Sequence, residues 1–348
     1  MGAATGPAAN AAPAVDRLRR SRPAGLHAGA RLTSIAGPEA ALALVADELG
    51  RAEVELRALV VSDVAEVPAI AGYLLDAGGK RLRPALTALG ARAVGFEGPV
   101  ARLMCVGELL HLGSLLHDDV VDDATLRRGR VATHRVHGAP AVVLTGDFCL
   151  ARAMWLAAQE GGFDAVEALG RTVTEMAEGE VLQLKRAGDL STTFDTYLDV
   201  IDRKSAALIS WCAAAGAWAA GDHGAAAALQ RFGRGVGKAF QITDDVLDYA
   251  TGTGKEPGAD LRERKVTLPL IFAMEELPWL RARLVAAPAD ADVGPWVEAI
   301  TTTAALDRSL QVAQGFADDA MSALDELPAG EPRDALRVLG AYLVERTR

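Results

Sequence analysis

The sequence predicts an all-α protein, and two observations support this prediction. Apolar residues recur at spacings of three and four along nearly the whole chain after residue 38, which is the periodicity of amphipathic helices. No run shows the strict alternation of apolar and polar side chains that is typical of a half-buried strand. We therefore expect helices to pack against helices around one buried core.

Glycine, proline and charged residues separate the periodic runs and set the expected helix boundaries. The clearest breaks are Ala77-Gly78-Gly79, Arg127-Arg128-Gly129 and Gly252-Thr253-Gly254. In chain order, the expected helices are 39–62, 66–76, 82–93, 97–122, 139–160, 163–187, 191–219, 222–250, 266–277, 289–327 and 330–346.

The composition is typical of an acidic, water-soluble protein. The 348 residues include 36 Lys plus Arg and 46 Asp plus Glu, which gives a net charge of −10, and 50% of the residues are hydrophobic. A protein that binds nucleic acid needs a surplus of cations to displace counterions, so nucleic acid is not the expected partner. The length fits either two domains or one large core.

The cysteines and the apolar runs indicate a cytoplasmic protein. Cys105, Cys149 and Cys212 lie in apolar runs without a C-x-x-C pair, which favours reduced core residues. The longest run of low polarity, 205–220, is shorter than the ~20 residues that cross a bilayer. We therefore expect a buried core helix there and no membrane span.

Residues 1–38 are rich in Ala, Gly and Pro and predict a disordered tail. The segment contains several arginines and only Asp16 as an acid, a composition that an organelle transit peptide shares. Import into an organelle therefore stays an alternative to a cytoplasmic location.

Two acidic clusters of the form Asp-Asp-x-x-Asp each end an apolar helix. Carboxylates four positions apart on a helix face the same way and repel each other, and the helix macrodipole disfavours anions at this end. A solvated helix face would explain one such cluster, but the repetition favours a metal site. Oxygen-only ligands suit a hard cation such as Mg²⁺, which substrate phosphates often help to bind. The clusters are Asp118-Asp119-Val120-Val121-Asp122 and Asp244-Asp245-Val246-Leu247-Asp248.

Cations near these clusters suit a diphosphate. Lys80 and Arg83 lie in a Gly-rich loop that leads into a helix, where backbone N–H groups can approach an anion. Arg127 and Arg128 follow the first acidic cluster and offer planar, bidentate donors. The loop is not a nucleotide P-loop, because Arg81 stands where Ser or Thr is required.

Taken together, these motifs resemble the trans-polyprenyl diphosphate synthase family, over about residues 40–348. Their order and spacing make the resemblance specific. The motifs are Gly78-Gly79-Lys80-Arg81-Leu82-Arg83-Pro84, the run from Leu115 through His117-Asp118-Asp119 to Asp122 with Arg127-Arg128-Gly129 after it, Gly146-Asp147, Lys204-Ser205, Phe240-Gln241 before the second cluster, and the ending Leu343-Val344-Glu345-Arg346.

The resemblance implies an isoprenoid synthase-like fold, a single large helical bundle around a central cavity, over residues 39–348. It implies a prenyltransferase that joins isopentenyl diphosphate to an allylic diphosphate, head to tail, by ionisation, condensation and proton loss. The resemblance also implies that the departing diphosphate accepts the proton, and no dedicated general base stands out in the sequence. A homodimer is also implied.

The resemblance also assigns site residues. Several Mg²⁺ ions would bind with the allylic diphosphate to Asp118, Asp119, Asp122, Asp244, Asp245 and Asp248. The expected allylic diphosphate contacts are Arg127, Lys204, Ser205, Gln241, Lys255 and Lys265, of which Arg127, Lys204, Gln241 and Lys265 are also expected to act in catalysis with Asp118, Asp119, Asp122 and Asp244. The expected isopentenyl diphosphate contacts are Lys80, Arg83, His111 and Arg128.

Product length is expected to depend on the side chains one turn before Asp118. The resemblance implies that an aromatic residue at position 113 stops chain growth early, whereas this chain has Gly113 and then Ser114. Small residues would leave the product tunnel open, so we expect a medium-chain or long-chain all-trans polyprenyl diphosphate. Geranylgeranyl diphosphate is the main alternative product, because Leu109, Leu110 or Met154 could close the tunnel deeper.

Three other hypotheses about the function stay open. The chain could be a non-catalytic subunit of a heteromeric prenyl synthase, a helical metal-binding scaffold or a terpene cyclase. Intact acidic clusters disfavour the first, and cations for a second diphosphate disfavour the last.

One departure from the family pattern concerns the segment after the second acidic cluster. Arg264 stands where the family usually has glycine, and an arginine adopts a positive φ less readily. Lys255 and Lys265 therefore lie in the segment of the expected site where this chain departs from the family pattern.

Overall fold

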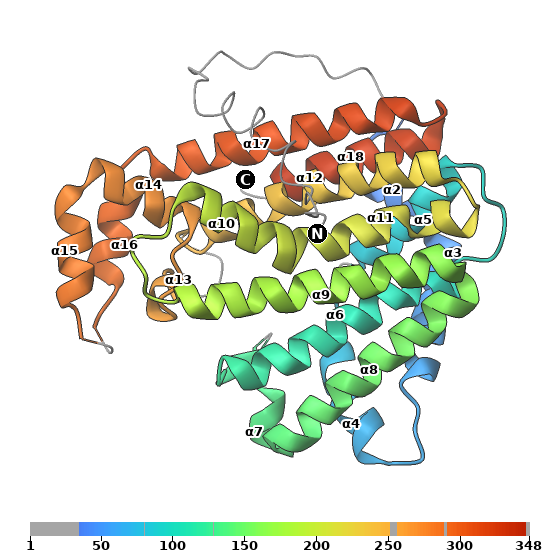
Figure 1. Cartoon of the computed structure of the whole chain (residues 1–348), viewed down its shortest axis with the longest axis horizontal. Helices are drawn as coiled ribbons and strands as arrows, with labels where there is room; N and C mark the ends of the chain where they lie inside the picture. The colour runs from blue at the N-terminus through green and yellow to red at the C-terminus, as the bar shows by residue number, and fades with distance from the viewer. Residues whose placement is uncertain (1–34, 80, 128, 251–255, 289–290, 346–348) are drawn as a thin grey trace, which may run out of the picture. The chain divides into compact units, whose positions relative to one another are not determined.

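The computed structural model describes residues 35–345, apart from residues 80, 128, 251–255 and 289–290. The described part is almost entirely helical and belongs to one unit, Ile35–Arg348 (Figure 1). The all-α prediction is therefore confirmed. The N-terminal helices are α2 (Pro38–Ala43), α3 (Ala46–Leu59), α4 (Glu66–Leu75), α5 (Leu82–Ala93) and α6 (Ala101–Val121).

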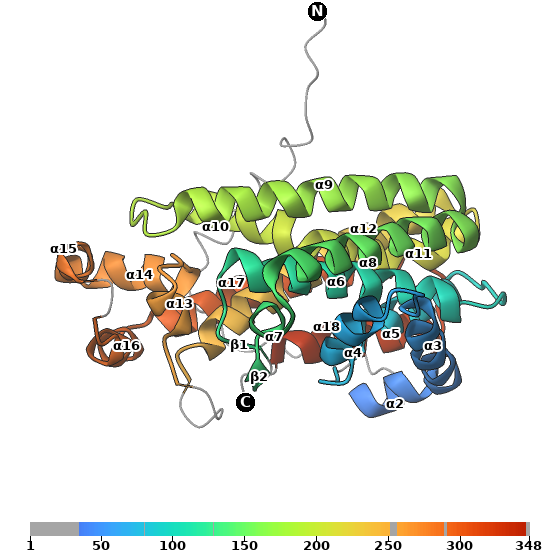
Figure 2. The same ribbon diagram turned by 90° about the horizontal axis from the view of Figure 1, so that it is seen from below.

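The central part of the chain supplies the longest helices and one small hairpin. Its elements are β1 (Leu126–Arg127), β2 (Arg130–Val131), α7 (Thr133–His137), α8 (Ala139–Glu160), α9 (Gly162–Arg186), α10 (Phe194–Ile201), the π-helical turn Asp202–Ala206, α11 (Ala207–Ala219) and α12 (His223–Leu247). The two strands are antiparallel, and Leu126 pairs with Val131 (Figure 2).

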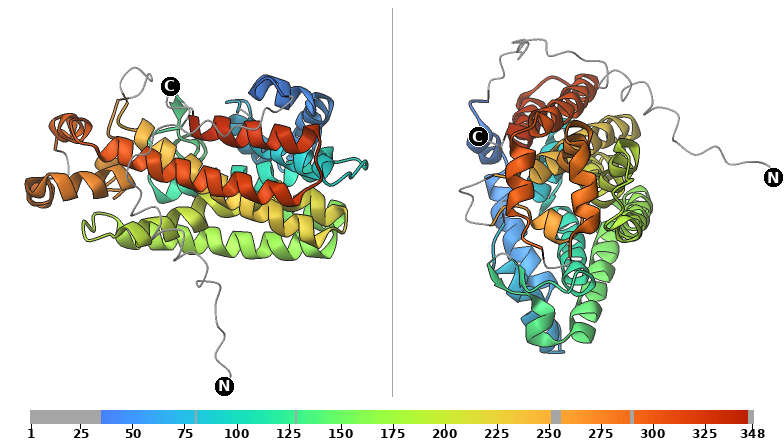
Figure 3. Two further views of the ribbon diagram at one scale, coloured as in Figure 1. Left: turned by 90° about the horizontal axis from the view of Figure 1, so that it is seen from above. Right: turned by 90° about the vertical axis from the view of Figure 1, so that its left-hand side faces the viewer.

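The C-terminal part adds shorter helices around the end of α12. They are α13 (Ala259–Arg262), α14 (Leu268–Glu276), α15 (Pro278–Ala286), α16 (Gly294–Thr301), α17 (Ala305–Ala323), the 3₁₀ turn Leu324–Glu326 and α18 (Glu331–Glu345). The helices α17 and α18 pack against α12 and against each other, as Figure 3 shows from above.

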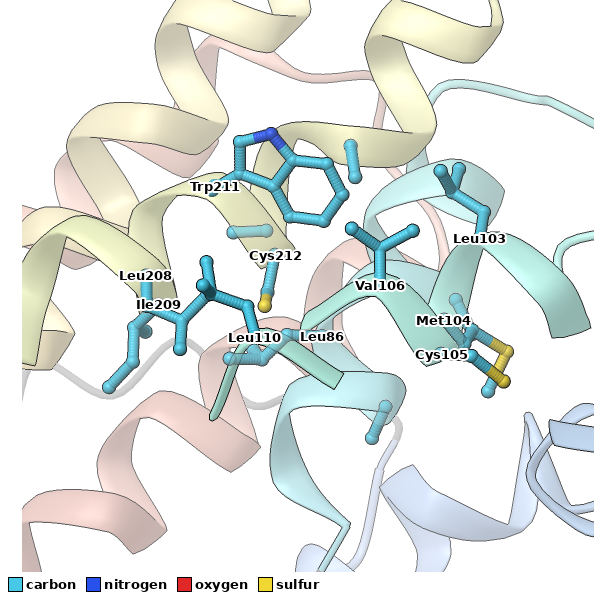
Figure 4. Packing of buried hydrophobic residues seen from close by; sticks show 14 of the residues in the cluster. Leu86, Leu103, Met104, Cys105, Val106, Leu110, Leu208, Ile209, Trp211 and Cys212 are labelled. Carbon is cyan, nitrogen blue, oxygen red and sulfur yellow. The ribbon is translucent and has the colours of Figure 1, made fainter. Parts of the chain in front are cut away.

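Helix α11 lies at the centre of the core and packs against α5, α9 and α12. Its residues from Ala207 to Ala217 are all buried, so most of the run 205–220 is a core helix, as the sequence predicts. Small residues allow this close packing, because a Cβ on Gly233 of α12 would lie 2.6 Å from the Cα of Ser210. Figure 4 shows Trp211 and Cys212 of α11 among side chains of α5 and α6.

Several expected boundaries were wrong. The expected helix 39–62 is two helices that separate at Leu44 and Val45, and Val45 leaves helical geometry with its side chain buried. The expected helix 191–219 contains a π-helical turn, and the expected helix 289–327 is divided into α16 and α17. The hairpin and the short helices α7, α13 and α15 were not expected. Pro278 starts α15, because proline fits the first turn of a helix but not its interior.

One described helix, α8, is long and apolar enough by length and composition to cross a membrane. Such a helix is equally typical of a soluble protein's core, and α8 packs against α6 and α9 through buried residues that include Val142, Cys149 and Ala153. Its other side leaves Leu144, with 66% of its surface exposed, and Trp155 accessible.

Candidate active site

A cavity of about 240 Å³ lies where the ends of several helices meet. Side chains from α6, α9, α10, the π-helical turn, α12 and the segment before α14 line it. Eight residues expected at the site from the sequence share this cavity, although they span almost 150 positions of the chain. They are Asp118, Asp122, Arg127, Lys204, Ser205, Gln241, Asp245 and Lys265.

The first acidic cluster forms the last turn of α6. Asp118 and Asp122 are four positions apart, so both face the cavity. Asp119 points elsewhere and is fully buried. Its Oδ1 accepts a 2.6 Å hydrogen bond from Arg127 Nε, and its Oδ2 accepts one from the Thr133 backbone N–H at 3.3 Å. Asp119 thus holds Arg127 of the hairpin.

The aspartates of the second acidic cluster also differ in their hydrogen-bond partners. Asp245 is buried, and Tyr197 Oη donates to its Oδ2 at 2.6 Å. Gln241 Nε2 donates to the Asp245 Oδ1 at 2.9 Å and accepts from Ser205 Oγ at 2.7 Å through its own Oε1. One hydrogen-bonded chain therefore connects the π-helical turn, α12 and α10.

Asp248 caps the short helix α13. Its two carboxylate oxygens accept hydrogen bonds from the backbone N–H groups of Ala259 and Asp260, at 3.1 and 3.0 Å. Asp244 is half-buried on α12, and neither it nor Asp248 is among the described residues that line the cavity.

Burial makes three carboxylates of the cavity difficult to ionise. It raises the pKa of Asp118 to about 6, although the nearby Lys204 ammonium opposes the rise. Burial also raises the pKa of Asp245 to about 7, against the hydrogen bonds from Tyr197 and Gln241. The pKa of Asp260 rises well above its ordinary range because of burial and the neighbouring Asp245. A bound cation would relieve this cost, so the carboxylates fit a hard divalent ion.

Lysines and an arginine face these acids. Lys204 forms an ion pair with Glu180 of α9. Lys265 Nζ lies 2.6 Å from Glu263 and 3.9 Å from Asp122. Burial lowers the pKa of Lys265, but the hydrogen bond from its ammonium to Glu263 and the nearby acids outweigh that effect and raise it. The cavity therefore presents positive charge beside its carboxylates.

Two of the residues expected to bind isopentenyl diphosphate, Arg83 and His111, lie on α5 and α6. A Cβ on Gly107 of α6 would be 3.7 Å from the Arg83 Cβ, and His111 is one turn further along α6. Arg83 Nε is buried without a hydrogen-bond partner among the described residues, which suits an anion contact. Arg81 is occupied by Glu53 and Glu108. Lys80, Arg128 and Lys255 lie outside the described residues, as does Arg346.

Gly113 lies at a close contact between two helices. Gly113 is buried where α6 meets α8, and a Cβ there would lie 2.9 Å from the Gly146 carbonyl oxygen. Ser114 is half-buried, and it precedes Asp118 by one turn, on the side of α6 that faces the cavity. Gly113 is therefore small because two helices meet there, and Ser114 is the better candidate for a tunnel residue.

Arg264 does adopt the conformation that glycine favours, with φ of 56°. Its carbonyl oxygen accepts a 2.8 Å hydrogen bond from the Gly188 N–H, and the Lys265 N–H donates to the Asp260 carbonyl at 2.8 Å. These bonds hold the turn that brings Lys265 to the cavity.

Sequence reasoning missed several residues that line the cavity. Asp260 lies four positions before Arg264, in the segment that departs from the family pattern, and no role was expected for it. Gln183, Arg186, Thr192 and Tyr197 belong to α9 and α10 or to the segment between them, and no spacing pattern singles them out.

The chain matches the family model described as "Polyprenyl synthetase" over residues 64–291. It is 37% identical to heptaprenyl diphosphate synthase component 2 of Geobacillus stearothermophilus, over 88% of this chain and 98% of that protein. It is 38% identical to octaprenyl diphosphate synthase of Escherichia coli (strain K12), over 82% of this chain and 92% of that one.

Solved structures agree with the sequence comparison. One is a polyprenyl synthase from Caulobacter crescentus CB15, complexed with calcium and isoprenyl diphosphate. It matches with a TM-score of 0.84 and 39% identity, and the match covers 91% of this chain and 100% of that one. A decaprenyl diphosphate synthase from Rhodobacter capsulatus has a TM-score of 0.83 and 36% identity, over 89% and 99% of the two chains. The fold, the cavity and these matches lead to one conclusion: the chain belongs to the polyprenyl synthetase family.

Proposed function

We propose that this protein is a prenyltransferase that adds isopentenyl diphosphate to an allylic diphosphate in successive head-to-tail steps. The observation that carries the proposal is the cavity in which Asp118 and Asp122 face Lys204, Lys265 and Arg127. The proposed product is a medium-chain or long-chain all-trans polyprenyl diphosphate. The relatives named heptaprenyl and octaprenyl diphosphate synthases favour this product over geranylgeranyl diphosphate.

Several Mg²⁺ ions are the proposed cofactor. Asp118 and Asp122 are the foremost ligands, because both face the cavity, and Asp244 is proposed from the second cluster. Asp119, Asp245 and Asp248 were expected as ligands too, but their oxygens accept hydrogen bonds from the protein, so we propose that they chiefly position their neighbours. Bound Mg²⁺ would act as a Lewis acid that stabilises the leaving diphosphate.

The side chains of this protein have distinct tasks in that reaction. Arg127, Lys204 and Lys265 neutralise the diphosphate while its negative charge grows, which is electrostatic stabilisation by groups that are already in place. Ser205 and Gln241 offer oxygen dipoles to the allylic carbon. Val200, Ile201 and Val266 form an apolar wall that keeps water from the carbocation.

The second diphosphate would bind next to this cavity. We propose Lys80, Arg83, His111 and Arg128 as its contacts, and Lys255 as a further contact of the allylic diphosphate. The unpartnered Nε of Arg83 supports this assignment for the described part of the site. The diphosphate that leaves is proposed to accept the proton that ends each step.

We also propose a domain organisation, a cellular location and an oligomeric state for this protein. Residues 39–348 form a single prenyl synthase domain after the tail 1–38, and the protein is cytoplasmic. It is a homodimer, and the exposed apolar side chains Leu144, Met154 and Trp155 of α8 offer a surface for the second copy.

Consumption of isopentenyl diphosphate by the purified chain tests the proposed function. With Mg²⁺ and farnesyl diphosphate, the wild type should incorporate labelled isopentenyl diphosphate, whereas Asp122→Asn should lose nearly all activity. Release of a cyclic hydrocarbon from the allylic diphosphate alone would indicate a terpene cyclase instead. Activity only after a second protein is added would indicate a subunit of a heteromeric synthase.

A further inference from the structure

The π-helical turn Asp202–Ala206 carries two of the proposed allylic diphosphate contacts, Lys204 and Ser205. The turn connects α10 to α11 and packs against α9 and α12 (Figure 1). At its end, the Ala207 N–H donates to the carbonyl oxygen of Asp202, five positions earlier, which is the hydrogen bond of a π-helix. Because π-helical turns are rare, contacts around this one must favour it over a regular α-helix.

Glycines bring both neighbouring helices close to the backbone of the turn. A Cβ on Gly179 of α9 would lie 2.7 Å from the backbone nitrogen of Lys204. A Cβ on Gly237 of α12 would lie 2.6 Å from the Cα of Ala206. This close packing fixes where the turn lies, but it contributes no directional bond that would fix the orientation of the turn.

The carboxylate of Asp202 receives the directional bonds. Arg234 Nε of α12 donates to its two oxygens at 3.1 and 3.2 Å, and Arg234 Nη2 donates to Oδ2 at 3.0 Å. Lys238, one turn further along α12, places its Nζ 3.4 Å from Asp202 Oδ1. The Arg234 Nη2 also donates to Glu175 of α9 at 2.6 Å. One guanidinium therefore connects the first residue of the turn to both neighbouring helices.

These charged groups are partly shielded from water. The side chains of Arg234, Asp202 and Glu175 are 31%, 28% and 33% exposed. A planar guanidinium that bonds two carboxylates in such a network stabilises more than an isolated ion pair on an open surface. Neither Arg234 nor Asp202 is among the described residues that line the cavity, so any effect of Arg234 on the site passes through the turn.

We propose that Arg234 is a positioning residue that holds Asp202 and thereby orients the π-helical turn that presents Lys204 and Ser205 to the cavity. It acts through Asp202 and touches no substrate. The kinetic consequence rests on the proposed function, whereas the effect on the turn is a property of the protein that can be measured without turnover.

The first test measures hydrogen exchange at the Ala207 amide, the donor of the π-helical bond, in the full-length protein. Arg234→Met keeps most of the apolar stem and removes the charge, so this amide should exchange about tenfold faster. The Ala132 amide, which bonds Thr125 beside the β1–β2 hairpin, should exchange as before. Arg231→Met is the matched control and should change neither amide, because Arg231 of α12 pairs with Glu326 on an exposed surface.

The second test compares the kinetics of the two substrates. Arg234→Met should lower kcat/KM for farnesyl diphosphate about tenfold and leave the KM for isopentenyl diphosphate nearly unchanged, because the misplaced contacts belong to the allylic diphosphate. Arg234→Lys keeps the charge without the bidentate geometry and should lose about threefold, which also keeps the test informative if Arg234→Met does not fold. In Asp202→Asn, the further change Arg234→Met should have little additional effect, since its target is already altered.

Unchanged exchange at Ala207 in Arg234→Met, or unchanged kinetics despite faster exchange, would overturn the proposal. Equal losses for both substrates would also overturn it, because they would indicate general loosening of the site. Fully additive effects of Arg234→Met and Asp202→Asn would show that Arg234 does not act through Asp202. If the wild type consumes no isopentenyl diphosphate, the proposed function fails, whereas the exchange experiment still decides whether Arg234 holds the turn.

Discussion

Arg127 Nε lies 2.6 Å from Asp119 Oδ1, so a cation proposed to bind diphosphate is fixed by a carboxylate of the first acidic cluster. Asp119 is fully buried, and its other oxygen accepts the Thr133 N–H. The three aspartates of this cluster therefore divide their tasks: Asp118 and Asp122 face the cavity, and Asp119 holds the hairpin.

This division predicts different effects for two similar substitutions. Asp119→Asn removes a charge-assisted hydrogen bond, which should lower kcat/KM for the allylic diphosphate about 10-fold to 100-fold. In Asp119→Asn, the Mg²⁺ concentration for half-maximal activity should change little, whereas in Asp122→Asn it should rise strongly. Magnesium titrations of both variants measure this, and an equally large rise in Asp119→Asn would identify Asp119 as a direct ligand.

Asp118 should destabilise the metal-free protein. Burial raises its folded-state pKa from the ordinary 3.8 to about 6, so the folded state binds the proton more tightly than the unfolded state between these values. The stability that this group contributes therefore falls as the pH rises through this window, and the cost is complete above pH 6. It amounts to at most about 3 kcal/mol.

Asp118→Asn should thus raise the melting temperature of the metal-free protein at pH 7.5 while it abolishes activity. The gain should shrink as the pH is lowered to 5, because the wild-type carboxyl then takes up its proton. Thermal unfolding in the presence of a chelator measures both effects. Asp319→Asn, on the exposed face of α17, is the control, and an equal gain there would contradict the role of burial.

The contact between α6 and α8 predicts that position 113 tolerates no side chain. Gly113→Ala should lower the free energy of unfolding by about 1–3 kcal/mol, because the new methyl group would press on the Gly146 carbonyl. Ser114→Ala should cost less than that. Chemical denaturation measures both, and no loss in Gly113→Ala would show that the helices can separate without cost.

Product length should respond to Ser114 and not to Gly113. A phenylalanine at position 114 would extend from the side of α6 that carries Asp118, and it should close the path of the growing chain. Ser114→Phe is therefore expected to make shorter products at a similar rate of the first addition. Mass spectrometry of the products measures this, and an unchanged length distribution would place the limit elsewhere.

The conformation of Arg264 predicts a stabilising substitution. An L-residue with a side chain pays about 1 kcal/mol for the left-handed region, so Arg264→Gly should raise the free energy of unfolding by up to that amount. Arg264→Ala keeps the unfavourable φ and serves as the matched control. A gain in both variants would show that the arginine side chain, and not its backbone, is the unfavourable part.

Much of the fold could be predicted from the sequence, because its helices bury one face against neighbours and therefore repeat apolar residues every three or four positions. The expected ranges 66–76, 82–93 and 139–160 lie within one residue of α4, α5 and α8. The π-helical turn around Lys204 and Ser205 left no such signal, because four of its five residues are polar and only Ala206 is buried. Short elements such as α13 depend on distant partners, here the carboxylate of Asp248.

The site was predictable as a set of residues but not as a set of orientations. The sequence motifs identify Asp118, Lys204 and Gln241 because their residue types and spacing are specific. In the structure, all three residues line one cavity. The hydrogen bonds that fix each aspartate follow no sequence pattern: Arg127 donates to Asp119 from eight positions away, and Tyr197 donates to Asp245 from 48 positions away.

Repeated condensation to a polyprenyl diphosphate is the activity that we propose for this chain. The most direct test incubates the purified protein with Mg²⁺, farnesyl diphosphate and excess isopentenyl diphosphate and determines the masses of the products. We expect a series of products that differ by single isoprene units and extend beyond geranylgeranyl diphosphate. Products confined to farnesyl diphosphate plus one unit would contradict it.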